Sequence, residues 1–436
     1  MPRPRWTLPL RRRGPAVLAA VVLLGTLAGC GGGQSGPPVL TWYINPDSGG
    51  QKEIAERCTA AAGGEYRIAI SVLPREASEQ RQQLVRRLAA GDDSIDLMSL
   101  DPPYIPEFSQ AGFLAPVPDD VARRVTDGVA ASAVEGATWN GKLVAVPFWA
   151  NTQLLWYKKS VAERAGLDMS QPVTWDQLIE AAKSQNTTIA VQGRRAESLV
   201  VWLNALIESA GGAVITGNAD KPQEIQLGLD SPQSQRASEV MAEVATSGVA
   251  GPAFTTSGED QNAAAFESGA ASFMVNWPFV WSRAESGVED GTLDKAVIDD
   301  FGWALYPRVD ADKPAAPPYG GINLGISSTS NHPDLAYKAA ECIVSADNQK
   351  YYFVSNGNPA SKLSVYTDPE VLADFPMAPV IAQSLQLAKP RPQTAYYSEV
   401  SGSLQRVYHP PTDVNSGTGP AAAELIRSVL AGEELL

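Results

Sequence analysis

The chain has 436 residues, 44% of them hydrophobic, and a formal net charge of −14. Its first 29 residues hold five arginines and no carboxylate, so the remaining chain carries a net charge of about −19. A body this acidic repels phosphate backbones, which argues against nucleic-acid binding. A chain of this length exceeds one hydrophobic core and therefore predicts two domains.

Residues 1–29 show the order of features that is typical of a secretory signal peptide. Arg3, Arg5 and the arginines at 11–13 precede an apolar segment at 16–28. Crossing a bilayer as a helix takes about 20 apolar residues, so this shorter segment is not predicted to be a transmembrane anchor. Leu27-Ala28-Gly29-Cys30 resembles the lipobox of bacterial lipoproteins, whose cysteine is diacylated. The alternative is an ordinary secreted protein with a chance cysteine near its cleavage site.

The lipobox resemblance implies that Cys30 anchors the mature protein to the outer face of the cell membrane. Two acyl chains are enough for stable anchoring, whereas a single chain binds only marginally. Residues 30–38 would then comprise the lipidated cysteine and a flexible, glycine-rich tether. We therefore expect an extracytoplasmic, lipid-anchored protein.

Strand and helix patterns alternate after residue 38, which predicts an α/β architecture. Residues 39–44, 66–72 and 95–100 have strand patterns, and 79–90 has an amphipathic helical pattern. This βαβ order predicts a mostly parallel sheet with loops gathered at the carboxyl ends of its strands. In open α/β sheets, ligands bind at that edge.

Two cysteines follow Cys30, and both lie in stretches with a helical pattern. In an exported protein an isolated pair is more often a disulfide than two free thiols. We predict a bridge between Cys58 and Cys342. It would place the beginning of the chain and the sequence beyond residue 320 in one domain.

Eight segments resemble, in the same order, segments of the sugar-binding proteins of ABC importers. They are residues 108–117, 140–147, 152–159, 173–178, 265–274, 319–326, 332–336 and 357–360. Each match is weak alone, but the ordered set is specific. The chain is also similar to the trehalose-binding lipoproteins of mycobacteria at residues 151–157, at 276–280 and around both cysteines.

This resemblance implies a type II periplasmic-binding-protein fold, whose two α/β lobes close on a ligand like a hinge. Each lobe is expected to be a mostly parallel sheet flanked by helices, with the ligand cleft between the lobes. Lobe 1 would comprise residues 39–150 and 321–370, and lobe 2 residues 151–320 and 371–436 with the C-terminal helices. The expected partners are a small neutral sugar and the permease subunits of the importer. The protein would act as a monomer without a cofactor.

A sugar-binding site needs carboxylates and amides for the hydroxyls and aromatic planes for the apolar faces. Asp101 follows the third strand, Asn151 lies in the first crossover between the lobes, and Trp277 ends an apolar strand. The resemblance places a ligand aspartate at the position of Asp101, and Trp277 with the following proline is expected to form a stacking platform at the cleft mouth. We predict all three as ligand residues. A turn-capping aspartate, a buried hinge amide and a core tryptophan are the respective alternatives.

Four further residues are weaker candidates for ligand contact. Gly321 and Asn323 lie in the predicted return hinge, where backbone amides could reach a ligand. Asn45 and Asp47 follow the first strand, but turn chemistry explains them equally well. Near the C-terminus the sequence departs from the family, because Ser401-Gly402-Ser403-Leu404 stands where a ligand arginine is expected. Whether Ser403 or the offset Arg406 takes that role is left open, and so is the identity of the sugar.

Three other classes of function were weighed against this one. A glycosidase needs two carboxylates roughly 5–10 Å apart, and aspartates are dense between Asp92 and Asp101. The sequence has no G-x-S-x-G elbow, and neither His332 nor His409 has a triad or zinc context. Cys/His clusters are absent, so no metal is predicted. A structural lipoprotein would leave the hinge-like segments without a role. The same fold binding a polyol, a peptide or an oligosaccharide remains an alternative.

The sequence therefore predicts a non-enzymatic, substrate-binding component of an ABC sugar importer. It would capture a small sugar, such as the disaccharide trehalose, by hinge closure and deliver it to the permease.

Overall fold

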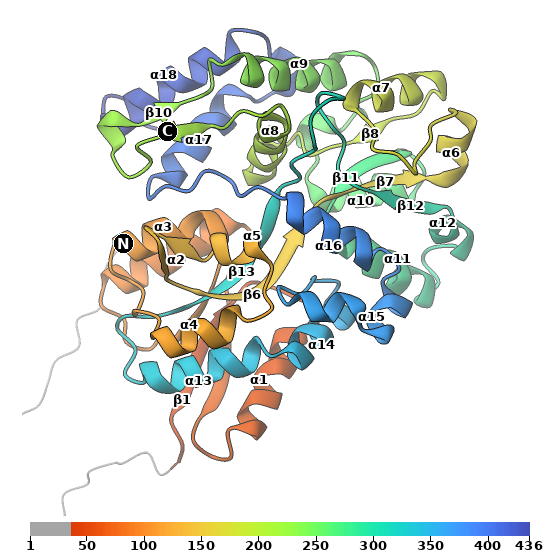
Figure 1. Ribbon diagram of the computed structural model, residues 1–436. Coiled ribbons are helices and arrows are strands. Elements are labelled where there is room, and N and C mark those ends of the chain that lie inside the picture. The colour runs from red at the N-terminus through yellow and green to blue at the C-terminus, as the bar shows by residue number, and fades with distance from the viewer. Residues whose placement is uncertain (1–35) are drawn as a thin grey trace, which may run out of the picture. The chain divides into compact units, whose positions relative to one another are not determined.

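Two mixed β-sheets organise residues 37–436 in this computed structural model (Figure 1). The structure describes residues 36–436, so the predicted signal peptide, Cys30 and the tether up to residue 35 lie outside the described part. Within that part, no helix is both long and apolar enough to cross a bilayer.

The first sheet has the strand order β2-β1-β3-β13-β6. Its strands are β1 (Val39–Ile44), β2 (Arg67–Val72), β3 (Leu97–Leu100), β6 (Val146–Thr152) and β13 (Tyr319–Ile326). β1 pairs in parallel with β2 and β3, whereas β13 runs antiparallel to both β3 and β6. Leu40 and Trp42 of β1 are fully buried in the core that α1 also covers, which fixes the register of this central strand.

The second sheet has the order β12-β7-β11-β8, with strands β7 (Leu154–Lys158), β8 (Ile189–Ala190), β11 (Phe273–Asn276) and β12 (Phe301–Ala304). Only β11 and β8 pair in parallel. The α/β architecture is as predicted, but the prediction of mostly parallel sheets is wrong. β6 continues directly into β7, and β13 returns from the other sheet. Strands that enter a sheet in this way run against their neighbours, unlike strands of βαβ units.

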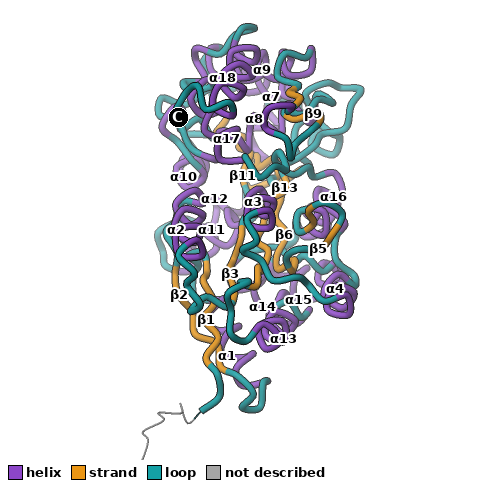
Figure 2. The backbone as a smooth tube through the Cα atoms, turned by 90° about the vertical axis from the view of Figure 1, so that its left-hand side faces the viewer, coloured by secondary structure: helices purple, strands orange, loops and turns teal. Residues whose placement is uncertain are grey.

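Helices flank the strands on both sides (Figure 2). We call the first sheet with its helices lobe 1 and the second sheet with its helices lobe 2. Lobe 1 has α1 (Gly50–Ala61), α2 (Ala77–Ala89), α3 (Ile105–Gln110), α4 (Asp119–Thr126), α5 (Ala131–Glu135), α13 (Pro333–Ile343) and α14 (Ala346–Asn356). Lobe 2 has α6 (Lys159–Arg164), α7 (Trp175–Ser184), α8 (Glu197–Ser209), α9 (Pro232–Thr246), α10 (Glu259–Glu267), α17 (Tyr397–Val407) and α18 (Thr418–Leu430). The residue boundaries of the two lobes given above stay a prediction.

The other helices share one core cluster with Ala150 of β6 and Tyr319 of β13, where the chain passes between the sheets. They are α11 (Phe279–Glu289), α12 (Lys295–Asp299), α15 (Pro369–Asp374) and α16 (Ala378–Leu387). Short elements complete the described chain: strands β4 (Thr138–Trp139), β5 (Lys142–Leu143), β9 (Ile215–Gly217) and β10 (Gln226–Leu227), and 3₁₀ helices η1 (Pro102–Tyr104), η2 (Pro222–Glu224), η3 (Phe254–Thr256), η4 (Leu363–Thr367) and η5 (Pro411–Asp413).

The chain passes between the lobes three times. The first crossing joins β6 to β7, the second runs from β12 through 305–318 to β13, and the third joins α16 to α17 through 388–396. The second and third crossings lie side by side, because Tyr319 N donates to Lys389 O at 2.8 Å and Lys389 N donates to Pro317 O at 2.9 Å. The end of the second crossing and the start of the third, which are far apart in sequence, are therefore hydrogen-bonded to each other between the lobes.

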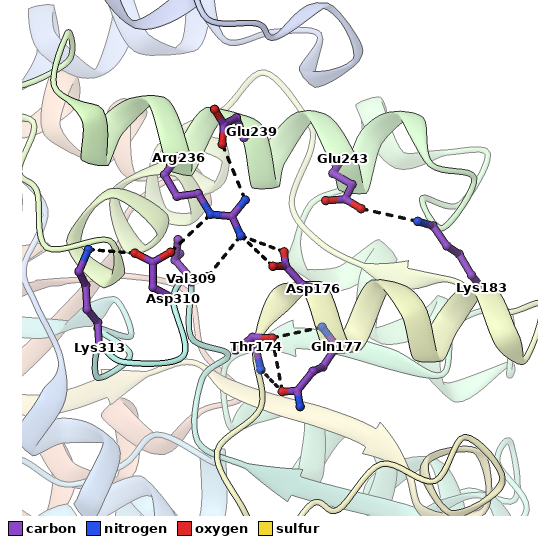
Figure 3. A network of polar contacts seen from close by, with 10 residues as sticks. All are labelled: Thr174, Asp176, Gln177, Lys183, Arg236, Glu239, Glu243, Val309, Asp310 and Lys313. Carbon is purple, nitrogen blue, oxygen red and sulfur yellow. Dashed lines mark hydrogen bonds and ion pairs between the residues drawn. The ribbon is translucent and has the colours of Figure 1, made fainter.

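Polar contacts tie the second crossing to the helices of lobe 2 (Figure 3). Arg236 of α9 donates from Nη2 to both carboxylate oxygens of Asp176 in α7, each at 2.9 Å. Asp310 of the crossing accepts from Arg236 Nε at 3.5 Å and from Lys313 Nζ at 2.9 Å. This network holds the start of the return path against two helices.

A disulfide joins Cys58 of α1 to Cys342 of α13, with their Cα atoms 5.8 Å apart and 284 positions between them in sequence. It links the first helix of lobe 1 to a helix that follows the last strand of the same sheet. The bridge therefore closes a loop that contains all of the second sheet.

Replacing both cysteines, as Cys58→Ala with Cys342→Ala, should lower the free energy of unfolding by about 2–5 kcal/mol, because the unfolded chain regains loop entropy. Urea unfolding followed by circular dichroism measures the change. Reduction of the wild type with dithiothreitol is the control and should give a similar loss. Equal midpoints for the oxidised and reduced wild type would contradict the expectation.

Candidate functional site

A cavity of about 610 Å³ is lined by residues of both lobes, including strands β6 and β13, and by Arg391 of the third crossing. Ligand pockets in proteins typically measure roughly 300–1,000 Å³. Lobe 1 contributes strand-end residues and lobe 2 contributes the starts of α8 and α10. The cavity thus lies at the edge where the sheet topology gathers loops.

Five of the seven predicted ligand residues line this cavity: Asp101, Asn151, Trp277, Gly321 and Asn45. Asp101 directly follows β3 and precedes the 3₁₀ turn that begins with Pro102. Asn151 lies on β6 opposite Gly320 of β13, and Trp277 follows β11. The structure brings these five together, and their contact with a ligand stays a prediction.

Asp47 and Asn323 do not line the cavity, and each has a structural role instead. Asp47 accepts from the backbone N–H groups of Gly49 and Gln51 at 3.0 and 2.7 Å, which caps the start of α1. Asn323 is fully buried in β13 and donates from Nδ2 to Gly136 O at 3.2 Å. Regular alternation would place Gly321 and Asn323 on one face of β13, but the pairing of β13 with β6 shifts register between Ile322 and Asn323. Asn323 is therefore buried in the core while Gly321 borders the cavity.

A pair of glycines on β13 shapes the aromatic wall of the cavity. A Cβ atom on Gly320 would lie 2.9 Å from Cη2 of Trp277, so the indole ring rests directly on the Gly320 backbone. Gly321 has a φ of +114°, and a Cβ there would lie 2.2 Å from the carbonyl oxygen of Trp149. Both positions require glycine, the first for the ring and the second for the backbone.

The sequence analysis missed the central cation of the cavity, Arg391, which lies on the third crossing. Its Nη2 donates to Asp101 Oδ1 and its Nη1 donates to Glu197 Oε1, both at 2.6 Å. Glu197 also accepts from the hydroxyl of Tyr397, and its Oε2 accepts from Ser401 Oγ at 2.6 Å. The arginine side chain is only 5% exposed, so this network is buried. The proline on each side of Arg391 was the only local signal.

Burial shifts the pKa values of this network. Burial, with the nearby Glu197 carboxylate, raises the pKa of Asp101 above its ordinary value, although Arg391 acts in the opposite direction. Burial alone would lower the pKa of Arg391, but the facing Asp101, Tyr397 and Glu197 hold it well above its ordinary value. Arg391 therefore stays charged, and the two carboxylates depend on it. Burial likewise raises the pKa of Glu259, which begins α10 and lines the cavity.

Neither residue considered for the arginine role near the C-terminus lines the cavity. Arg406 pairs with Glu434 at 2.9 Å, and Ser403 Oγ donates to Glu399 O at 2.7 Å within its own helix. Ser401 instead supports Glu197. Arg391, the buried cation of the cavity, lies ten residues before Ser401 and outside any helix.

Of the dense aspartates between 92 and 101, only Asp101 borders the cavity. Asp92 accepts from Ser94 N at 3.0 Å and pairs with Arg87 at 2.6 Å. Asp96 accepts from Thr41 N at 2.8 Å within the lobe 1 core. These carboxylates stabilise loops and strand ends, so the local density of aspartates does not build a paired-carboxylate site.

Two ion pairs join the lobes beside the cavity. Arg75 of lobe 1 pairs with Asp260 of lobe 2 at 2.6 Å, and Glu76 of lobe 1 pairs with Arg194 of lobe 2 at 3.2 Å. All four residues line the cavity and are partly exposed. Exposed pairs of this kind contribute about 0–1 kcal/mol each. They therefore orient the facing edges of the two lobes and add little to the free energy that holds the lobes together.

Several residues that line the cavity have a buried polar atom without a partner in the described protein. These atoms are Asn45 Oδ1, Trp149 Nε1, Arg194 Nε, Ser198 Oγ and Arg391 Nε. A buried donor or acceptor without a partner costs about 1–3 kcal/mol of stability. No group of three or more potential metal-binding side chains occurs in residues 36–436.

Comparison with known proteins gives consistent matches. A family model described as bacterial extracellular solute-binding protein matches residues 51–350. A mannitol-binding protein of Pseudomonas aeruginosa is 27% identical over 341 residues, 75% of this chain and 74% of that protein. A maltotriose-binding protein of Pyrococcus abyssi is 24% identical over 306 residues, 69% of this chain and 62% of that protein.

Solved structures show the same fold. Maltose-bound MalE3 of T. maritima has a TM-score of 0.77 at 27% identity, over 90% of this chain and 99% of that one. The GacH receptor of Streptomyces glaucescens has a TM-score of 0.74 at 20% identity, over 92% of this chain and 100% of that one. The predicted two-lobe, type II fold class is confirmed.

Replacing Gly320 with alanine should push the Trp277 ring away from β13 and weaken ligand binding about tenfold, because stacking depends on ring position. Isothermal titration calorimetry measures the dissociation constant, and urea unfolding checks that the fold persists. Gly321→Ala is the matched control. Its new methyl group would clash with the Trp149 backbone, so this variant should have a lower free energy of unfolding than the wild type. Unchanged affinity in a folded Gly320→Ala variant would disprove the role given to the ring.

Proposed function

The chain belongs to the bacterial extracellular solute-binding proteins, and we propose that it captures a small neutral sugar for an ABC importer. Its role is solute binding rather than catalysis, as in the relatives, which are binding proteins. The observation that carries the proposal is the cavity between the lobes, where Trp277 offers an aromatic plane and Asp101 and Asn151 offer polar groups.

The chemistry of the cavity favours a neutral, polyhydroxylated ligand. Trp277 and Trp149 supply apolar faces, and Asn45, Asn151 and Ser198 supply groups that bond hydroxyls. Asp101 uses only Oδ1 for Arg391, so its other oxygen is open to a hydroxyl. A carboxylate acceptor makes a charge-assisted hydrogen bond, which is stronger than a neutral one.

For the cargo we propose a disaccharide such as trehalose. The support is the similarity of residues 151–157 and 276–280 to trehalose-binding lipoproteins, together with a cavity of about 610 Å³. A polyol is the second candidate, because a relative at 27% identity is a mannitol-binding protein. Hydroxyl-rich chains and rings use the same amides and carboxylates, so the two candidates need a direct test.

We also propose that Cys30 carries a lipid anchor, on the basis of the Leu27-Ala28-Gly29-Cys30 motif. Anchoring would hold the monomer at the outer membrane face, where the closed form meets the permease. Binding would proceed from open lobes to a closed form that sequesters the sugar. The three crossings are the segments about which such a closure would turn.

A thermal-shift screen of the protein from Gly31 onward tests the ligand class. The panel contains mono- and disaccharides including trehalose and maltose, with mannitol and amino acids. A ligand at 100 times its dissociation constant stabilises by about 2.7 kcal/mol, which raises the melting temperature measurably. We expect a shift with one uncharged sugar or polyol. No shift with any of them would reject the proposed function.

Trp277→Ala should abolish the ligand-induced shift while the melting temperature without ligand stays nearly unchanged, because Trp277 borders the cavity rather than the core. Trp175→Ala is the matched comparison, since Trp175 is fully buried in lobe 2. It should cost about 3–5 kcal/mol of stability. If Trp277→Ala unfolds as readily as Trp175→Ala, the indole belongs to the core.

A further inference from the structure

Glu197 borders the cavity, yet the protein's own donors occupy both of its carboxylate oxygens. Arg391 and the Tyr397 hydroxyl donate to Oε1, and Ser401 donates to Oε2. The side chain is 15% exposed and lies at the first residue of α8, where a helix favours negative charge. A carboxylate held by three donors is fixed, so Glu197 acts on a ligand through Arg391 and not by direct contact.

Arg391 presents a guanidinium to the cavity, the group that proteins commonly use to bind carboxylates and phosphates. Here each terminal nitrogen already donates to a carboxylate of the protein, Nη1 to Glu197 and Nη2 to Asp101, each at 2.6 Å. The charge of the guanidinium is thus compensated by the protein before a ligand enters. One cation between two carboxylates leaves a local charge of −1.

The other charges of the cavity lining add to this effect. The lining includes three arginines and five carboxylates, and the two remaining arginines pair with carboxylates across the lobes. An anionic ligand would therefore meet described lining residues whose three arginines and five carboxylates leave a net charge of −2. Bringing a charge into a buried site without a partner is costly.

We propose that Glu197 is a positioning residue that makes this site select uncharged sugars and refuse anionic ones such as uronic acids and sugar phosphates. The inference rests on the proposed function and deepens it, because it names the class that is excluded and the residue that excludes it. Removing the charge of Glu197 would take the counter-charge away from Nη1 of Arg391 and bring the local charge to zero. The cavity would then offer a cation to a ligand anion.

The test uses Glu197→Gln and the wild type in isothermal titration calorimetry with matched probes. The pairs are trehalose with trehalose 6-phosphate, mannitol with mannitol 1-phosphate, and glucose with glucuronate. We expect the wild type to bind an uncharged member and discriminate against its anion. In Glu197→Gln the ratio of the anionic to the neutral dissociation constant should fall at least tenfold, about 1.4 kcal/mol.

Two control variants separate charge from mere structure. Glu197→Asp keeps the charge, so its ratio should stay within about threefold of the wild type. Ser401→Ala removes one hydrogen bond to Glu197 and leaves every charge in place. It should weaken binding of the neutral member while the ratio stays unchanged. If Glu197 had a purely structural role, Glu197→Gln would behave in the same way and leave the ratio unchanged.

The outcomes distinguish this inference from the proposed function. A wild type that binds no uncharged sugar or polyol overturns both. A wild type that binds the neutral member, with an unchanged ratio in folded Glu197→Gln, overturns the inference alone. If circular dichroism shows that Glu197→Gln does not fold, Asp101→Asn is measured instead, because it gives the same net charge of zero around Arg391. An unchanged ratio there likewise overturns the inference.

Discussion

One buried arginine joins the parts of the molecule that form the cavity. Arg391 comes from the third crossing, Asp101 from the end of β3 in lobe 1, and Glu197 from the start of α8 in lobe 2. Both carboxylates are largely buried and share the one guanidinium as their counter-charge. Removing Arg391 would leave two uncompensated carboxylates, which is strongly destabilising in a buried site. The positions of Tyr397 and Ser401 follow from the same network, since both donate to Glu197.

Such a network does little for net stability, because desolvation of three charges offsets most of their attraction. Its consequence is geometric. Through Arg391 the network bonds Asp101 of lobe 1 to Glu197 of lobe 2. Two exposed ion pairs between the lobes, Arg75 with Asp260 and Glu76 with Arg194, act in the same direction with smaller energies. These contacts bring polar groups of both lobes to the cavity.

The crossings decide where the aromatic surface lies. Trp277 rests on the bare backbone of Gly320, and Gly321 adopts a φ of +114° beside Trp149. Both glycines belong to β13, the strand that returns from lobe 2 and lies between β3 and β6 of lobe 1. A strand that connects the lobes thus forms one wall of the cavity and sets the position of the Trp277 ring.

The sequence alone determined the alternation of strands and helices, the order of family motifs, and the residues that follow strands. Asp101 and Trp277 were predictable at the cavity because a strand end is visible in the local pattern, and sheet edges gather ligand sites. Asn323 and Asp47 lie outside the cavity lining, because the direction of one side chain and the hydrogen bonds at a helix start depend on register and backbone geometry.

Tertiary structure alone decided the direction of the strands and the central cation. Antiparallel pairing arises because β7 and β13 enter their sheets from the opposite lobe, a path that no local pattern records. Arg391 meets Asp101 across 290 positions of sequence. Local patterns carry information over a few residues, whereas that ion pair exists only because three crossings bring distant segments to one place.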